Sequence, residues 1–281
     1  MRQLAGLAIL ILIAAVPSSA LDWSRDPVDQ ARAQLAAAPL SVAVAPAPRR
    51  GGGGGTPGQF DSYVFSLEWT PAFCEGKGSL PECARLTPDA FASTHLALHG
   101  LWPDQSSDPS HGYGYCGVDA QTRSLDRGAT WCRMPALSLA DATMSRLSVD
   151  MPGTASCLEN HEWYKHGSCS GYGPDEYFAR AAGLVEQAST LAFGRFLTAH
   201  AGQTVAAADL RAAFESDFGA GSGADLTLTC TRAHGDALLL DVRMHLATPL
   251  RPAAELSSML LPVAGSGNCP SSFLIDPAPG S

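Results

Sequence analysis

Apolar and polar positions alternate along several short stretches of the chain. Between residues 63 and 69, Tyr, Phe, Leu and Trp alternate with Val, Ser and Glu, which predicts a half-buried strand. A second strand is expected over 91–98, so that it delivers His99 at its end, where Gly100 and Pro103 break the pattern. Further stretches with strand character are 226–230, 237–246 and 273–275.

Other stretches carry apolar residues at helical spacing. They predict helices over 138–149, 174–200 and 209–218, the longest of which has Pro174 at an allowed position in its first turn. Loops are expected over 71–88 and 106–128. This mixture predicts an α+β fold, in which a central antiparallel β-sheet is accompanied by several helices.

The N-terminus has the pattern of an export signal. Arg2 precedes an apolar run over 4–16, and small residues follow at 17–20, which predicts a secretory signal peptide over 1–20 with cleavage near Ala20. The apolar run is too short to span a bilayer. We therefore expect a secreted or periplasmic protein with no membrane anchor after cleavage.

The next segment, 21–58, is rich in Ala and Pro and finishes in a glycine run at 51–55. Such a composition cannot bury enough apolar surface to offset its ordering entropy. It predicts a flexible linker or pro-segment, with a short amphipathic helix over 28–38 as the alternative. The folded domain is then expected over 59–276, followed by a tail over 277–281.

Eight cysteines all fall within the predicted domain. An even number of cysteines in an exported chain predicts four disulfides. The sequence by itself leaves about 100 possible pairings. The cysteines are Cys74, Cys83, Cys116, Cys132, Cys157, Cys169, Cys230 and Cys269.

Two stretches, 99–104 and 161–169, gather three histidines, a glutamate and a lysine. Imidazoles with an ordinary pKa of about 6.5 exchange protons near neutral pH, and a neighbouring cation can hold a phosphate. These groups can perform phosphoryl transfer without a metal or another cofactor. In the second stretch the charged residues alternate with Trp163 and Tyr164 and end at a Cys, which is not typical of a solvated helix face.

The spacing in the second stretch predicts one wall of an active site. On a helix, Glu162 and His166 share one face, and His161 and Lys165 share the adjacent face. Gly167 then suits the end of that helix. A zinc protease motif would need two histidines four positions apart, whereas His161 and His166 are five apart and point about 140° from each other on an ideal helix. We therefore expect no metal site.

The two stretches resemble the active-site segments of the ribonuclease T2 family of secreted acid endoribonucleases. The patterns His-Gly-Leu-Trp-Pro, at 99–103, and His-Glu-Trp-x-Lys-His-Gly-x-Cys, at 161–169, are both present without a substitution. A looser likeness runs from about Tyr63 to Ile275. The resemblance implies a disulfide-stabilised α+β fold and suggests the pairs Cys116–Cys169 and Cys230–Cys269. A local Cys74–Cys83 loop then leaves Cys132 with Cys157.

The resemblance also implies a role for each polar residue of the two segments. His166 would be the base that takes the 2′-hydroxyl proton, and His99 the acid that protonates the departing 5′-oxygen. Glu162 and Lys165 would stabilise the developing charge, and His161 would hold the phosphate. The products would be 2′,3′-cyclic phosphates and then 3′-phosphates. DNA would resist cleavage, and the rate would be bell-shaped in pH with an acidic optimum.

Base recognition is expected from residues near the first segment. Trp102 would stack on a base, Asp104 would accept a hydrogen bond from an exocyclic amine, and Tyr113 or Tyr115 would close the other side. The alternative places Trp102 in the core and Asp104 at a turn. Glu68 lies near the position where relatives often carry an uncharged polar residue, so the resemblance does not define the preference for the second base. A low base specificity is expected.

Charge restricts how the domain can bind its partner. Residues 59–281 carry a net charge of −11 without histidines, and Lys77 and Lys165 are the only lysines in the chain. A broad basic surface for nucleic acid is therefore excluded, and binding of single-stranded RNA must depend on the motif cluster. We expect a monomer. The alternative from a different functional class is a secreted RNA- or protein-binding member of the same fold that has lost catalysis.

Overall fold

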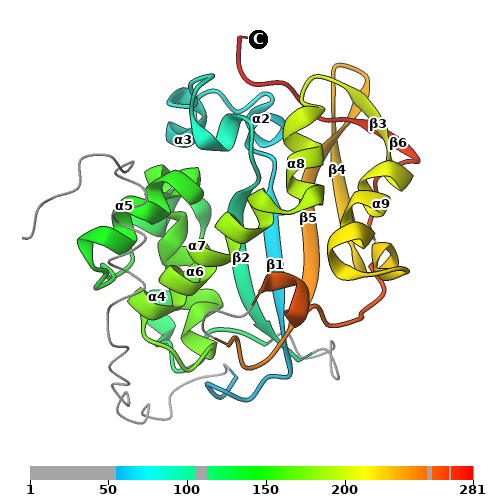
Figure 1. Ribbon diagram of the computed structural model, residues 1–281. Helices are drawn as coiled ribbons and strands as arrows, with labels where there is room; N and C mark the ends of the chain where they lie inside the picture. Colours follow the sequence, from blue (N-terminus) through cyan, green and yellow to red (C-terminus); the bar gives the residue numbers. More distant parts are fainter. Residues whose placement is uncertain (1–54, 106–112, 252–254, 266, 281) are drawn as a thin grey trace, which may run out of the picture. The chain divides into compact units, whose positions relative to one another are not determined.

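The computed structural model describes residues 55–105, 113–251, 255–265 and 267–280. They belong to a compact unit that spans 45–281 (Figure 1). The predicted signal peptide and the alternative helix over 28–38 lie outside the described residues. Within the described part, no helix combines the length and apolarity that a membrane crossing requires.

A six-stranded sheet forms the centre of the unit, with strand order β2-β1-β5-β6-β3 and with β4 paired to β5. All pairings are antiparallel except the short parallel contact between β5 and β6. The predicted α+β class is thereby confirmed. The strands are β1 Ser62–Glu68, β2 Ala97–Asp104, β3 Thr204–Ala206, β4 Thr227–Ala233, β5 Asp236–Ala247 and β6 Ser272–Leu274.

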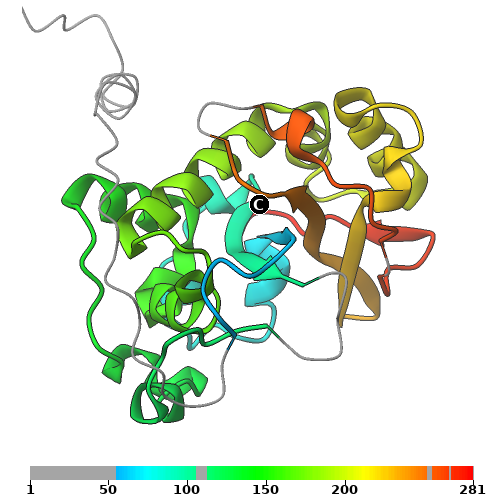
Figure 2. The same ribbon diagram turned by 90° about the horizontal axis from the view of Figure 1, so that it is seen from below.

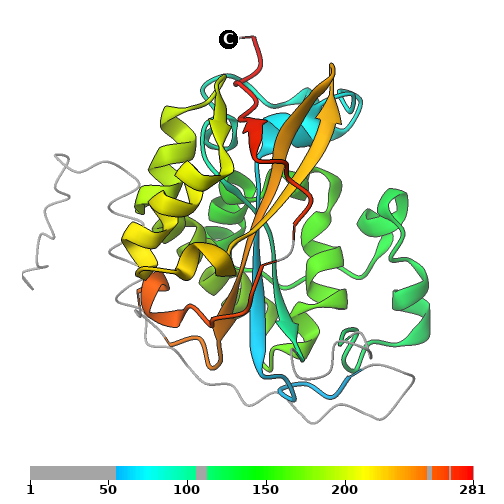
Figure 3. The same cartoon turned by 90° about the vertical axis from the view of Figure 1, so that its right-hand side faces the viewer.

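Helices lie on both sides of this sheet, as the edge-on view in Figure 3 shows. The α-helices are α2 Thr70–Cys74, α3 Pro81–Ala84, α4 Ala120–Ser124, α5 Asp141–Asp150, α6 Leu158–Lys165, α7 Pro174–Thr190, α8 Ala192–Ala199 and α9 Ala207–Phe218. The 3-10 turns are η1 Phe91–Ser93, η3 Gly128–Arg133, η4 Pro152–Ser156, η5 Gly167–Cys169, η6 Ser222–Asp225 and η7 Leu256–Met259.

Four boundaries differ from the sequence predictions. The long helix over 174–200 is two helices, because Leu191 adopts an extended conformation and Gly194 brings α8 against the end of α7, where a Cβ would lie 2.1 Å from the Ala188 carbonyl oxygen. The strand predicted over 91–98 begins only at residue 97, since Phe91–Ser93 forms a 3-10 turn. The loop predicted over 71–88 contains α3 and most of α2, and that over 106–128 contains α4.

The register of the sheet separates an apolar face from a polar one. Residues that pair across antiparallel strands share a face. Phe65 pairs with Leu101 and Met244, and this buried face belongs to the main core. The opposite face carries rows of polar residues: Gly100–Ser66–Arg243, Ala97–Glu68–Asp241 and Trp102–Val64–His245.

The pairing of neighbouring strands is interrupted at two positions, each by one extra residue. In β2, Gly100 pairs with Ser66 and Leu98 pairs with Leu67, so His99 is an extra residue without a partner on β1. In β5, Leu240, directly before Asp241, is likewise an extra residue, in this case without a partner on β4. Such bulges bend a strand and re-aim a side chain. His99 therefore lies within β2, at a bulge, and not at the end of a strand as the sequence predicted.

Four disulfides hold the segments around the sheet, and all four predicted pairs are confirmed: Cys74–Cys83, Cys116–Cys169, Cys132–Cys157 and Cys230–Cys269. Figure 2 shows the green segment that carries α4, α5 and α6 beside one end of the sheet, with α9 and β4 at the other. The end of the predicted linker contacts this unit, since the backbone N–H of Gly58 donates to the Cys169 carbonyl over 2.9 Å.

Candidate active site

Strand β2 and helix α6 meet at Gly100. A Cβ on Gly100 would lie 2.1 Å from Nε1 of Trp102 and 2.2 Å from Oε2 of Glu162. Only glycine has room for this approach, because the contacting atoms belong to side chains that are held by a hydrogen bond to each other. The first motif thus needs its glycine to bring the second motif against the sheet.

A Gly100→Ala substitution is expected to lower RNA cleavage by about 100-fold, because an added methyl group must push Trp102 and Glu162 apart. Initial rates on a defined oligoribonucleotide measure the loss. Gly183→Ala in α7 is the matched control, since its Cβ meets nothing within 4 Å. Equal rates for G100A and G183A would show that the approach at Gly100 does not matter for activity.

Disulfides fix the second motif at both ends. Helix α6 begins after Cys157, which pairs with Cys132, and the turn after the helix contains Cys169, which pairs with Cys116. His161, Glu162 and Lys165 lie on the helix as predicted. His166 follows it, with φ −117° and ψ −59°.

The indole of Trp102 is surrounded by site residues. Its Nε1–H donates to Oε2 of Glu162 over 2.6 Å, and its ring stacks on that of His166 with centroids 5.1 Å apart. The His99 ring meets it edge-on at 5.3 Å. The guanidinium of Arg243 lies over it, also at 5.3 Å. Trp102 therefore joins the two motifs and brings both histidines to one place.

His161 is held by a buried carboxylate. Its Nδ1 lies 2.5 Å from Oδ1 of Asp126, whose side chain is 2 % exposed. Asp126 also accepts hydrogen bonds from Trp131 Nε1 (2.8 Å) and from the Tyr115 hydroxyl (2.6 Å). The Trp131 ring stacks on His161 at 4.8 Å. Although burial opposes it, these hydrogen bonds lower the pKa of Asp126, so it faces His161 as an anion.

His99 has a carboxylate partner of its own. Nδ1 of His99 lies 3.0 Å from Oδ1 of Asp241, which is itself paired with Arg243 at 3.0 Å. The His99 side chain keeps 30 % of its surface exposed, whereas Asp241 keeps 5 %. His99 is thus anchored through one ring nitrogen and is partly exposed to solvent.

The two motif histidines have opposite pKa shifts. Burial, and then the positive charges of Lys165, His161 and His99, lower the pKa of His166 well below its usual value. Burial also opposes the charge on His99, but the hydrogen bond to Asp241 and the charge of Glu162 prevail and raise its pKa to about 8. Near neutral pH, His166 is therefore a neutral proton acceptor and His99 a charged proton donor.

Glu162 lies in the middle of the cluster and is 1 % exposed. Burial raises its pKa, against the opposing effect of His99 and His161. Within the described part of the chain, its Oε1 atom and Nδ1 of His166 are buried without a hydrogen-bond partner. Buried polar atoms without partners are costly, which is consistent with a place that a bound substrate completes.

Among the residues that the structure describes, two groups bring possible metal-binding atoms within 4.8 Å of one another: His161 with Glu162 and His166, and Glu68 with His99 and Asp241. The first group corrects the argument from helical spacing. His166 has left the helix, so its ring meets that of His161 at a centroid distance of 5.9 Å despite the five-residue separation. In both groups, Nδ1 of one histidine already has a hydrogen bond to a carboxylate of the protein.

The residues expected to bind a base have the following contacts. Asp104 is the last residue of β2 and lies on the same face of the strand as Trp102. The Trp102 ring stacks on His166 and lies beneath the Arg243 guanidinium. The hydroxyl of Tyr113 donates to the Thr56 carbonyl over 2.5 Å, and that of Tyr115 to Asp126. Both tyrosines thus support neighbouring segments, and a direct contact of these residues with a base stays a prediction.

Sequence reasoning missed Asp126, Trp131, Asp241 and Arg243. Asp241 and Arg243 had a detectable signal: they interrupt the apolar run of β5 at alternate positions, so they share one face of the strand. Asp126 lies in a loop, 35 residues before His161, and has no local pattern that marks it.

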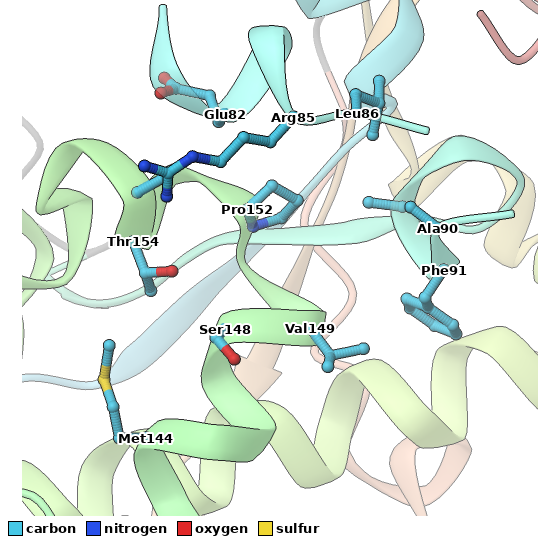
Figure 4. A pocket seen from close by; sticks show the side chains of 12 residues that line it. Glu82, Arg85, Leu86, Ala90, Phe91, Met144, Ser148, Val149, Pro152 and Thr154 are labelled. Atoms are coloured by element: carbon cyan, nitrogen blue, oxygen red, sulfur yellow. The ribbon is translucent and has the colours of Figure 1, made fainter. Parts of the chain in front are cut away.

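A separate pocket of about 480 Å³ lies between α3, η1, α5 and η4 (Figure 4). It is lined by Leu86, Phe91, Met144, Val149 and Pro152, with Arg85 and Glu82 at one side (Figure 4). No residue of the two motifs lines it. This pocket is therefore separate from the two motifs.

Comparisons with known proteins identify the family of the chain. The ribonuclease T2 family model matches residues 60–254. Ribonuclease I of Escherichia coli is 31 % identical over 241 residues, covering 79 % of this chain and 88 % of the relative. Ribonuclease MC1 from bitter gourd seeds has a similar fold, with a TM-score of 0.51, 22 % identity and coverage of 76 % of this chain and 100 % of that one. Ribonuclease NT in complex with 5′-AMP has a TM-score of 0.53, with 19 % identity and coverage of 78 % and 99 %. The chain belongs to the ribonuclease T2 family.

Proposed function

We propose that this protein is an exported endoribonuclease that cleaves single-stranded RNA by transphosphorylation, with no metal or other cofactor. The observation that carries the proposal is the pair of histidines with opposite proton affinity, His99 and His166, which contact the same indole. RNA supplies its own nucleophile, so a base, an acid and a stabiliser for the phosphorane are sufficient.

In the first step, His166 takes the proton of the 2′-hydroxyl while the 2′-oxygen attacks phosphorus. The bond from phosphorus to the 5′-oxygen breaks, and His99 gives its Nε2 proton to that oxygen. Lys165 and Glu162 stabilise the charge that develops on the phosphoryl oxygens, and His161, held by Asp126, binds the phosphate. The products are a 2′,3′-cyclic phosphate and a free 5′-hydroxyl.

In the second step, water opens the cyclic phosphate and the two histidines exchange roles. His99, now neutral, takes a proton from water, and His166, now charged, returns a proton to the 2′-oxygen. A 3′-phosphate results, and both histidines regain their starting protonation states. The requirement for a 2′-hydroxyl excludes DNA as a substrate.

Substrate recognition in this proposal is local. Asp104 accepts a hydrogen bond from a base, Trp102 borders the site, and base specificity is low. The acidic body leaves the motif cluster as the place for the phosphate, which favours a flexible single strand that can enter it. We propose a monomer that the N-terminal signal directs to the periplasm or the exterior.

An in-gel RNA cleavage assay at about pH 5 and about pH 8, with and without a chelator, tests the proposal. Cleavage that the chelator leaves unchanged is the expected result. Loss of cleavage on chelation would identify a metalloenzyme that uses one of the two donor groups. A refolded chain that retains RNA in a mobility-shift assay but never cleaves it would identify an inactive binding protein.

The pH dependence of kcat/KM is expected to be bell-shaped. The rate rises as the pH increases through the pKa of His166, which lies well below 6.5, because the base must be neutral. It falls as the pH increases through about 8, because His99 must carry a proton. The active range thus extends from acidic into neutral pH. Initial rates from about pH 4 to about pH 9 check this, and a steady rise into alkaline pH would contradict it.

A further inference from the structure

Asp241 lies where it can control His99. Its Oδ1 accepts from Nδ1 of His99 over 3.0 Å, and its Oδ2 accepts from Arg243 over 3.0 Å. Nε of Arg243 donates to the Ser66 hydroxyl over 3.1 Å. The two oxygens of a buried carboxylate are thus divided between an imidazole and a guanidinium that is itself anchored to the middle of the sheet.

The register of the sheet brings His99 and Asp241 to the same face. His99 is the extra residue of β2, and Leu240, directly before Asp241, is the extra residue of β5. The two strands are separated by β1, yet the side chains of His99 and Asp241 meet across it. A pairing that spans a whole strand and coincides with two bulges is a specific feature of this sheet.

We propose that Asp241, held in place by Arg243, is a positioning residue for His99: it keeps the proton of the neutral ring on Nδ1, so that Nε2 is directed at the substrate. This inference rests on the proposed function. The proposed role involves no proton transfer to Asp241. Each proton that His99 gives or takes in the reaction passes through its Nε2 atom.

The two steps of the reaction need this arrangement for different reasons. During cleavage His99 is an imidazolium, and the carboxylate fixes its orientation and favours its charge. During hydrolysis of the cyclic phosphate His99 must accept a proton at Nε2, and only the tautomer with hydrogen on Nδ1 can do so. An asparagine at position 241 can instead offer its NH₂ group to Nδ1 and so stabilise the inactive tautomer.

Other charged groups also face His99, so the pH readout must allow for them. Glu68 on β1 and Glu162 on α6 both favour the charged ring, and burial raises the pKa of Glu68 itself to about 7. Arg243 on β5 and His166 after α6 are the neighbouring cationic or protonatable groups. Asp241 differs from Glu68 and Glu162 in that it has a hydrogen bond to the His99 ring.

The test compares Asp241→Asn with the matched control Asp236→Asn, an exposed aspartate on the same strand. D241N is expected to lower kcat by about 10- to 100-fold for cleavage and at least as much for hydrolysis of a cyclic nucleotide. KM should stay within about 2-fold, and the alkaline limb of the pH profile should move below that of the wild type. D236N should match the wild type in kcat for cleavage, in kcat for hydrolysis, in KM and in the alkaline limb of the pH profile.

A spectrum of the unmodified protein tests the inference without depending on a variant that folds. Long-range ¹H–¹⁵N correlation NMR on ¹⁵N-histidine protein, above the pKa of His99, is expected to show the Nδ1–H tautomer for this ring. The Nε2–H tautomer would overturn the inference. So would a D241N variant with wild-type kcat and pH profile. If the wild type cleaves no RNA at all, the proposed function fails instead, and the tautomer still reports on the Asp241 contact.

Discussion

Replacing His166 or His99 by alanine is expected to lower RNA cleavage by about 10²- to 10⁴-fold, the usual contribution of a positioned acid or base. His166 loses the neutral imidazole that takes the 2′-hydroxyl proton, and His99 loses the proton donor for the 5′-oxygen. The remaining catalysis then comes from Lys165, Glu162 and His161. Initial rates on a defined oligoribonucleotide, with folding checked by circular dichroism, give the measurement.

The pH profile separates these two variants from each other. H166A should lose the acidic limb and keep the fall near pH 8, whereas H99A should keep the acidic limb and lose that fall. His234→Ala is the matched control, since this side chain is 80 % exposed and pairs with Glu75 away from the motifs. If H166A or H99A cleaved RNA as fast as H234A, the assignment of acid and base would be wrong.

A single 2′-deoxynucleotide on the 5′ side of a cleavable bond is expected to abolish cleavage at that bond. The nucleophile is then missing, while base, phosphate and leaving group are unchanged. Cleavage products of an oligoribonucleotide, with and without the one deoxy position, can be compared on a sequencing gel. The neighbouring bonds serve as internal controls, because they should be cleaved at their normal rate. Cleavage at the deoxy position would mean that water attacks phosphorus directly.

Local patterns predicted the parts of the molecule that depend on local sequence. The alternation over 63–69 marks a strand because one face packs on the core and the other faces the polar side of the sheet. The motif over 161–169 includes the second half of helix α6. Its Gly167 brings Trp163 against Tyr177, where a Cβ would lie 2.6 Å and 3.0 Å from their rings.

Contacts between residues far apart in the sequence could not be predicted from local patterns. His99 and Asp241 are 142 residues apart, and the register of three strands, with the bulge in β2, brings them together. Helical spacing placed His161 and His166 on different faces, but the chain leaves the helix at His166. Likewise, no apolar pattern marks the extended residue Leu191, because helical segments with apolar residues continue on both sides of it.

Trp102 makes more contacts within the protein than its place in the first motif predicts. Its place in the first motif predicts a surface on which a base stacks. In the fold its indole also bonds Glu162, stacks on His166 and lies beneath Arg243. Positioning the catalytic side chains is thus a second task for this residue, and the one that its contacts directly describe.

The identity of the first product tests the central claim most directly. Cleavage of a single-linkage diribonucleotide in ¹⁸O-water, in the presence of a chelator, can be followed by mass spectrometry from the earliest time points. Transphosphorylation predicts a 2′,3′-cyclic phosphate without ¹⁸O that appears first, followed by a 3′-phosphate with one ¹⁸O atom. A first product that already contains ¹⁸O, or one with a 5′-phosphate, would contradict transphosphorylation by His166 and His99.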